Sequence, residues 1–251
     1  TVAVVTNAQR AHLEGMGGLD EVAREKGSIF SGLTADGVAV INADDAYAGL
    51  WREMAAGHEQ RSFGIEQPAE GRGTLRQHGL ETLVTLQAPE GAAEICLTVP
   101  GTHNARNALA AAATCLAAGI PLAAVVAGLE RFAGVKGRLQ VRSGRAGAVV
   151  LDDTYNANPD SVRAGIEVLA ATIGRKILVL GDMGEIGEAS GQFHDEIGGF
   201  AKSQGVDLLF GTGDACQQAL QWHGGFAFQR AAFSLEGLLH AHGVDQHEAG
   251  L

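Results

Sequence analysis

The chain has 251 residues, of which 46% are hydrophobic and 19% are charged, a composition typical of one large or two modest globular domains. Its formal net charge of -11 argues against nucleic-acid binding, because phosphates are held by clustered Lys and Arg. The three cysteines lie far apart in the sequence and form no metal-binding pair, so we expect no zinc–thiolate site. An odd number of cysteines without a signal peptide favours a cytoplasmic protein.

The first part of the chain alternates between strand and helix patterns. Apolar runs and helical spacing predict strands at residues 2–5, 37–42 and 61–65, and helices at residues 19–30 and 44–54. Residues 80–86 and 94–99 then alternate with period two on either side of a turn, which predicts a β-hairpin.

Residues 109–129 are almost wholly apolar and long enough to cross a bilayer. The stretch is rich in Ala, however, and it is interrupted by glycine and proline at residues 119–121. Pro121 suits the first turn of a new helix. We therefore predict two packed helices, at about 104–118 and 122–132, and no membrane insertion.

A domain boundary is expected near residues 134–137, beyond which strand and helix patterns alternate more regularly. The predicted strands are at residues 148–151, 176–180 and 207–210 and around Phe226, and the predicted helices at 159–171, 191–204, 215–221 and 235–240. Repeated strand–helix units imply a parallel sheet with right-handed crossovers.

The run at residues 152–161 is the strongest candidate for a functional site. It joins an apolar strand to a helix, and open α/β sheets bind ligands at the carboxyl ends of their strands. Asn158 suits a helix N-cap, and the two residues after it suit the first turn of the helix. Four other polar residues have no such local explanation: Asp152, Asp153, Tyr155 and Asn156.

Two further groups of residues are weaker candidates when taken alone. Asn104 and Asn107 lie one turn apart at a predicted helix start, where anions are favoured, although Asn104 could simply cap the helix. His12 follows a strand in a glycine-rich loop, and a histidine with an acid nearby could hold Mg²⁺ through neighbouring groups. Taken alone, however, His12 and Lys26 are more typical of structural or surface side chains.

Two more segments lie close to these in the predicted fold. Residues 178–187 run from a strand into glycines and acids, and we expect them at the same sheet edge as Asp153. Arg138 lies at the domain boundary, where an arginine can bind a phosphate bidentately when two domains close, or can be a simple linker charge.

Taken in this order, the motifs resemble those of the Mur ligases of peptidoglycan synthesis. The resemblance runs roughly from residue 4 to residue 220 and rests on residues 12–15 with Lys26, 101–107, 137–138, 152–159 and 181–187. It implies an α/β fold with a partial central ATPase-type domain containing a β-hairpin at residues 1–135. A Rossmann-like C-terminal α/β domain that lacks its last strand would follow at residues 136–251.

The resemblance also implies roles for site residues in the first domain. His12 would help to hold a second Mg²⁺, and Lys26 matches the lysine that the family carbamylates. A carbamate is anionic, which suits a magnesium bridge. Asn104 and Asn107 would contact the adenine side of ATP.

In the second domain, the resemblance implies that Arg138 and Asp153 contact the phosphate and ribose of ATP. Tyr155, Asn156 and Asn158 would face an incoming dipeptide. The motifs at residues 152–159 and 181–187 are most similar to those of family members that add D-alanyl-D-alanine to UDP-N-acetylmuramoyl-tripeptide. In that reaction ATP converts a carboxylate into an acyl phosphate, which the dipeptide amine attacks. We expect a cytoplasmic monomer.

The sequence departs from the family at one important point. The phosphate-binding loop, a metal-binding glutamate and the UDP-binding domain are not found in these 251 residues. We therefore expect a chain incomplete at both ends that does not turn over ATP alone. The alternative is a non-catalytic nucleotide- or peptide-binding module; a nicotinamide oxidoreductase is disfavoured because the dinucleotide fingerprint is missing.

Overall fold

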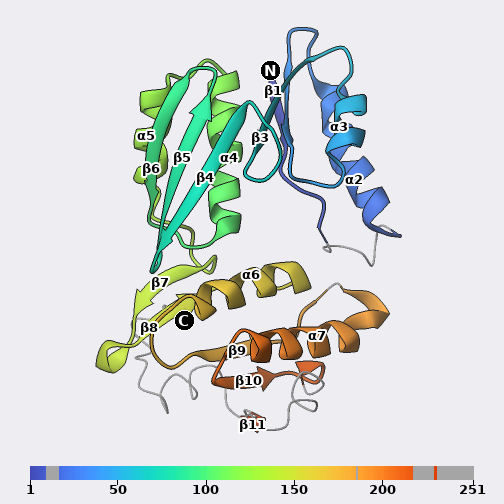
Figure 1. Cartoon of the computed structure of the whole chain (residues 1–251). Helices are drawn as coiled ribbons and strands as arrows, with labels where there is room; N and C mark the ends of the chain where they lie inside the picture. Colours follow the sequence, from blue (N-terminus) through green and yellow to red (C-terminus); the bar gives the residue numbers. More distant parts are fainter. Residues whose placement is uncertain (10–16, 185, 217–228, 231–251) are drawn as a thin grey trace. The chain divides into compact units, whose positions relative to one another are not determined.

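The computed structural model describes residues 1–9, 17–184, 186–216 and 229–230. It divides into two compact units, Thr1–Ala133 and Gly134–Leu251 (Figure 1). The division falls two residues before the boundary expected from the sequence. Each unit has its own sheet and its own core, and the two are described separately.

Unit 1 contains a six-stranded mixed sheet with the strands in sequence order. Its strands are β1 (Val2–Val5), β2 (Val38–Asn42), β3 (Glu59–Gly64), β4 (Gly71–His78), β5 (Glu81–Ala88) and β6 (Gly91–Leu97). Strands β1 to β4 run parallel to one another. Strand β5 is antiparallel to both of its neighbours, β4 and β6. The predicted hairpin corresponds to β5 and β6.

Helices cover both faces of this sheet. One face packs against α2 (Leu19–Gly27), the 3-10 helix η1 (Ser28–Gly32) and α3 (Ala48–Met54), and the other against α4 (Thr102–Ala117) and α5 (Leu122–Glu130) (Figure 1). Strand β2 is buried along its whole length, because Val40 packs on the α4 side while Ile41 packs on the α3 side. Burial of both faces explains why its sequence is a continuous apolar run.

The predicted break between α4 and α5 is present, since α4 ends at Ala117 and α5 begins at Leu122 directly after Pro121. Within the described part of the chain, we find no helix with the length and apolar character needed to span a bilayer.

Strand β4 has no counterpart among the strands predicted from the sequence. Its buried positions, Gly71 and Gly73, carry no side chain, so the strand shows no alternation of apolar and polar residues. The glycine at position 73 has a packing reason: a Cβ there would lie 2.5 Å from Cδ1 of Leu109 in α4. Close approach of α4 to the sheet therefore removes the hydrophobic signal on which strand prediction depends.

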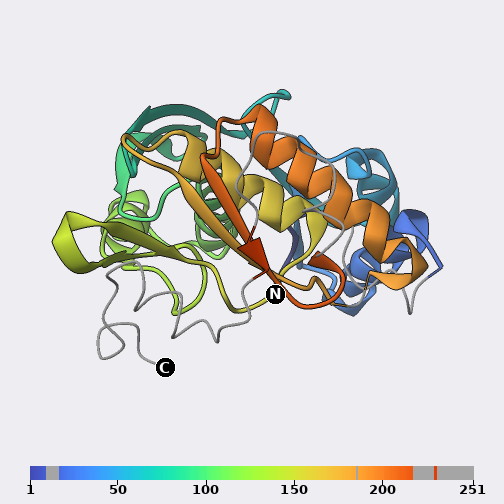
Figure 2. The ribbon, with the colours of Figure 1, turned by 90° about the horizontal axis from the view of Figure 1, so that it is seen from below.

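Unit 2 combines two small sheets with two long helices. A parallel sheet contains β9 (Ile177–Gly181), β10 (Leu208–Thr212) and β11 (Gln229–Arg230), and an antiparallel pair contains β7 (Gln140–Ser143) and β8 (Val149–Asp152). Figure 2 shows α6 (Pro159–Ala170) and α7 (Ser190–Ser203) side by side. The core between helices and sheet includes Ile166, Leu180, Ile197 and Leu209. The strand predicted around Phe226, the helix at 235–240 and most of the helix at 215–221 lie outside the described residues.

The expectation that the strand at residues 148–151, here β8, belongs to the same parallel sheet as β9 and β10 is wrong. Among the described residues β8 pairs with β7, so Asp153 and the segment after β9 do not follow strands of one sheet. Strand β7 was not predicted, because it is short and three of its four residues are polar. Arg142 of β7 forms an ion pair with Asp152 at the end of β8, with Nε 3.3 Å from Oδ2, and this polar contact joins the two strands.

Candidate functional site

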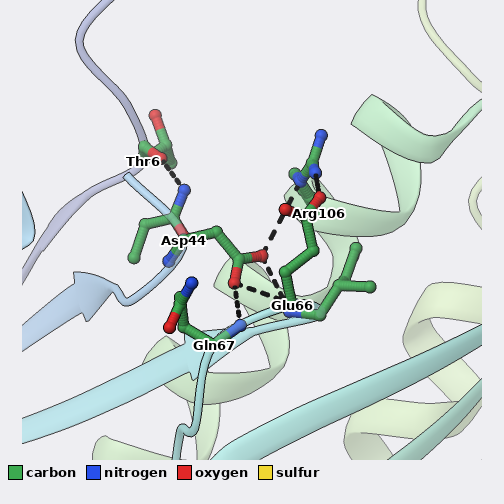
Figure 3. Close-up of polar contacts among 7 residues, drawn as sticks. Thr6, Asp44, Glu66, Gln67 and Arg106 are labelled. Carbon is green, nitrogen blue, oxygen red and sulfur yellow. Dashed lines mark hydrogen bonds and ion pairs between the residues drawn. The ribbon is translucent and has the colours of Figure 1, made fainter. Parts of the chain in front are cut away.

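Polar loops follow β1, β2 and β3 at one edge of the unit 1 sheet. Because these strands are parallel, their carboxyl ends meet at the edge where α/β sheets bind ligands. Asn42, which is 5% exposed, donates from Nδ2 to the Thr6 carbonyl oxygen at 2.8 Å (Figure 3). This bond holds the loop after β1 against the end of β2.

Asp44 fixes the loop after β3. Its carboxylate, only 5% exposed, accepts backbone N–H groups from Ile65 at 2.7 Å, Glu66 at 3.0 Å and Gln67 at 2.8 Å (Figure 3). Gly64 allows the approach, since a Cβ there would lie 2.8 Å from Oδ1 of Asp44. Asp44 is therefore a buried charge satisfied by three consecutive amides, and it was not among the residues predicted from the sequence.

The neighbouring Asp45 explains why α3 begins later than predicted. Its Oδ1 accepts the Tyr47 amide at 2.9 Å, and its Oδ2 accepts the Ala8 amide at 2.9 Å. These bonds shape a turn in place of the first helical residues, so α3 begins at Ala48 and not at residue 44.

Asn104 and Asn107 lie in the first turns of α4, as the spacing predicts. Asn104 is not the N-cap, a position held by Gly101; its Nδ2 donates to the Pro100 carbonyl oxygen at 2.8 Å. Asn107 is exposed. Both amides are thus presented at the start of a helix that covers the sheet.

Arg106 lies between these two asparagines in sequence and contacts acids from two loops. Its Nη2 donates to Oε1 of Glu66 at 2.6 Å, and its Nε is 3.8 Å from Oδ2 of Asp44 (Figure 3). Burial and the guanidinium charge both lower the pKa of the His103 imidazole, and burial is the larger cause.

Lys26 lies on α2 near the end of β1. Its Nζ donates to the Asn7 carbonyl oxygen at 2.9 Å, and the side chain lines a surface hollow of about 470 Å³ with Thr6 and Ile29 among its walls. Partial burial lowers the pKa of Lys26, and the negative charge of Asp45 opposes this in part. His12, its predicted partner, lies outside the described residues.

In unit 2, three of the predicted site residues lie together. Asp153 accepts the Leu139 amide at 3.0 Å, and the Arg138 guanidinium stacks over the Tyr155 ring at 4.1 Å from its centroid. The Tyr155 amide also donates to the Gly137 carbonyl oxygen at 2.9 Å. Burial raises the pKa of Asp153, while the Leu139 bond and the Arg138 charge oppose the rise.

The other two predicted residues make local bonds. Asn158 caps α6: its Oδ1 accepts the Ser161 amide at 2.9 Å, and Oγ of Ser161 accepts the Asn158 amide at 3.0 Å. Asn156 accepts the amide of Ala157 at 2.9 Å. Of the three residues predicted to face a dipeptide, Tyr155, which is 67% exposed, and Asn156 are exposed, whereas Asn158 is half-buried.

Asp182, His194 and Cys216 lie close enough to hold a metal ion, but their bonds assign them to packing. The Met183 amide donates to Nε2 of the buried His194 at 3.0 Å, and Nδ1 is 2.7 Å from the Ser190 carbonyl oxygen. Burial raises the pKa of Cys216 to about 12, and its Sγ donates to the Leu180 carbonyl oxygen at 3.3 Å. The cluster fixes the segment that follows β9.

Comparison with known sequences defines the class of protein. The Mur ligase middle domain matches residues 1–115, and the Mur ligase glutamate ligase domain matches residues 137–232. Together the two matches cover most of both units. The chain belongs to the Mur ligase family.

Among individual proteins, UDP-N-acetylmuramoyl-tripeptide--D-alanyl-D-alanine ligase of Escherichia coli (strain K12) is 40% identical over 215 residues, which are 84% of this chain and 47% of that protein. A crystal structure of MurF from Acinetobacter baumannii superposes with a TM-score of 0.87 at 35% identity, covering 96% of this chain and 53% of that one. MurF ligase from Thermotoga maritima in complex with ADP gives a TM-score of 0.77 at 26% identity, covering 87% and 50%.

The chain spans about half the length of the curated relatives it matches. The structural similarity confirms the predicted α/β fold class, and the sequence similarity confirms the resemblance to Mur ligases, most of all to MurF.

Proposed function

We propose that this chain works in an ATP-dependent amide-bond ligase that adds D-alanyl-D-alanine to UDP-N-acetylmuramoyl-tripeptide. The observation on which the proposal depends is the 40% identity, spread over 215 residues, to a protein of that named activity. The reaction would pass through an acyl phosphate, which the amine of the dipeptide attacks with release of phosphate.

ATP would bind at the carboxyl edge of the unit 1 sheet. Asn104 and Asn107 present side-chain amides there, and an amide can both donate to and accept from an adenine edge. The similarity to a MurF ligase in complex with ADP supports nucleotide binding, and the edge is our proposal for its place. The roles of the two asparagines remain predictions.

Mg²⁺ prefers oxygen ligands, so Lys26 fits a magnesium site only as a carbamate. Its environment favours that reaction, since a lowered pKa increases the fraction of neutral amine, the form that attacks carbon dioxide. Lys26 as a carbamate, together with His12, would then hold the ion, which neutralises charge during phosphoryl transfer when bound.

In unit 2, Arg138 would bind the ATP phosphates and Asp153 the ribose. Stacking on Tyr155 restricts the rotamers of Arg138 and leaves its planar donors available to an anion. Tyr155, Asn156 and Asn158 stay as predicted contacts of the dipeptide; because Asn158 is used in a capping box, we give most weight to Tyr155.

We also propose that the protein works in the cytoplasm, where ATP and nucleotide-linked precursors are available, and that it acts as a monomer without nucleic-acid partners. The net charge of -11 supports the last point.

The test compares this chain with an extended chain, lengthened upstream to include a phosphate-binding loop. The assay measures phosphate release from ATP as a function of UDP-muramoyl-tripeptide and D-alanyl-D-alanine. We expect turnover by the extended chain only when both substrates are present, and none by these 251 residues, which contain no phosphate-binding Gly-rich loop. Failure of the extended chain to turn over ATP would contradict the ligase assignment.

A non-catalytic nucleotide- or peptide-binding module is the second candidate. Calorimetric titration with ADP, combined with the phosphate-release assay, separates the two. A binding module would bind nucleotide in the extended chain without releasing phosphate under any combination of substrates.

A further inference from the structure

We infer that Asp44 and Arg106 are positioning residues that hold the first turns of α4, and with them Asn104 and Asn107, in the place that binds nucleotide. The inference rests on the proposed function, because it assumes that nucleotide binds at this edge. It adds a second layer of residues behind the predicted adenine contacts.

Asp44 provides the fixed point of this arrangement. Its carboxylate is almost fully buried, and a buried charge is tolerated only where hydrogen bonds or an opposite charge compensate it. The three amides of residues 65–67 give that compensation from one loop. The charge of Arg106 approaches the same carboxylate from α4. Asp44 therefore joins the end of β2, the loop after β3 and the start of α4 (Figure 3).

Arg106 pairs with two acids, and the two pairs contribute unequally. Glu66 is 67% exposed, so its ion pair contributes little, whereas Asp44 is 5% exposed and its charge is poorly screened. The contact with Asp44 should therefore fix the position of the first turns of α4 against the sheet.

The geometry of the guanidinium supports a role in positioning rather than in ligand binding. Arg106 faces two acids of its own unit, and among the described residues its buried Nε has no hydrogen-bond acceptor, only the Asp44 carboxylate at 3.8 Å. The neighbouring Asn107 is exposed and open to a ligand. A shift of ~1 Å in a positioned group can cost on the order of 10²-fold in rate, so small errors at α4 matter.

The test measures nucleotide affinity and steady-state kinetics in the extended chain with Asp44→Asn, Arg106→Gln and Arg106→Lys. We expect Asp44→Asn and Arg106→Gln to raise the Kd for ADP and the KM for ATP by about tenfold, the loss of one charged interaction. The KM for D-alanyl-D-alanine should stay unchanged. Arg106→Lys keeps the charge and should recover part of the affinity. Arg61→Gln, which breaks an ion pair with Glu59 and Glu90 elsewhere on the sheet, is the matched control and should leave both constants unchanged.

If Asp44→Asn folds poorly, the inference is tested with Arg106→Lys and Arg106→Gln, which leave Asp44 in place. Hydrogen exchange of the amides of residues 65–67 then checks that the bonds to Asp44 are kept in these two variants. Unchanged nucleotide affinity in both Arg106 variants would overturn the inference, as would equal losses in the Arg61 control. If the unsubstituted extended chain binds ADP but forms no amide bond, the proposed function fails while the ADP affinities still decide the inference. If it binds no ADP, both fail.

Discussion

The two units position their polar residues in different ways. In unit 1, Asp44 and Arg106 bond to residues that lie 21 to 40 positions away in the chain. In unit 2, Asn156 and Asn158 bond to residues one to three positions away, and Asp153 bonds to a residue 14 positions away. A site built from distant contacts depends on the whole unit being folded, whereas a site built from near contacts depends on one loop and one helix start.

The largest effect that tests this contrast is expected from removing one carboxylate in each unit, that of Asp44 in unit 1 and that of Asp153 in unit 2. Asp44→Ala should cost on the order of 3 kcal/mol of the free energy of unfolding of unit 1, because three backbone amides and an arginine lose their buried partner. Asp153→Ala removes one backbone hydrogen bond from a partly exposed group and should cost about 1 kcal/mol in unit 2.

Native-state hydrogen exchange measures the free energy of unfolding of each unit separately, through the amides of β2 for unit 1 and of β9 for unit 2. Comparable losses in the two units would show that Asp44 is not the main anchor of its edge, and would remove the distinction drawn above.

A second prediction concerns the close packing of unit 1. Gly73→Ala should destabilise by about 1–3 kcal/mol, since the new methyl group overlaps the buried Leu109 and one of the two must move. Gly49→Ala in α3 is the matched control, because a Cβ at that position would have no other atom within 4 Å and an alanine favours the helix by about 0.5–1 kcal/mol. Urea unfolding of both variants should therefore give shifts of opposite sign.

The same contrast explains what sequence reasoning could find. The polar run at residues 152–158 is contiguous, and with Gly137 and Arg138 it was sufficient to select residues that the structure brings together. Their chemical roles stay predictions. The hairpin of β5 and β6 and the break before Pro121 were also predictable, because alternation and proline are local signals.

Asp44 and β4 could not be found in this way. The partners of Asp44 are backbone amides some 20 residues away, and a backbone amide has no signature in the sequence. In β4 the buried positions are glycines, and at Gly73 the reason is the close approach of Leu109 from the distant helix α4. The pairing of β7 with β8 was missed for a related reason, since a four-residue strand with a single apolar residue gives a weak pattern.

A third prediction uses the pKa of His103 in unit 1. Burial and the Arg106 charge lower this pKa below its ordinary value of 6.5, so the folded state resists protonation more than the unfolded state does. The stability of unit 1 should therefore fall as the pH drops through 6.5, and His103→Gln should reduce that fall. His78→Gln, at an exposed position on β4, is the matched control for the loss of an imidazole.

The contribution of Asp153 to the stability of unit 2 should have the opposite pH dependence. Burial raises the pKa of Asp153 above its ordinary value of 3.8, so the folded state holds a proton more tightly than the unfolded state. The stabilisation is complete below pH 3.8 and is lost as the pH rises through the folded-state pKa. The stability of Asp153→Asn relative to the unsubstituted chain should therefore increase with pH. Asp207→Asn, an exposed aspartate that also accepts one backbone hydrogen bond, is the control. A difference that does not vary with pH would mean that Asp153 is effectively solvated, and that its carboxylate is not held in a desolvated position beside Arg138.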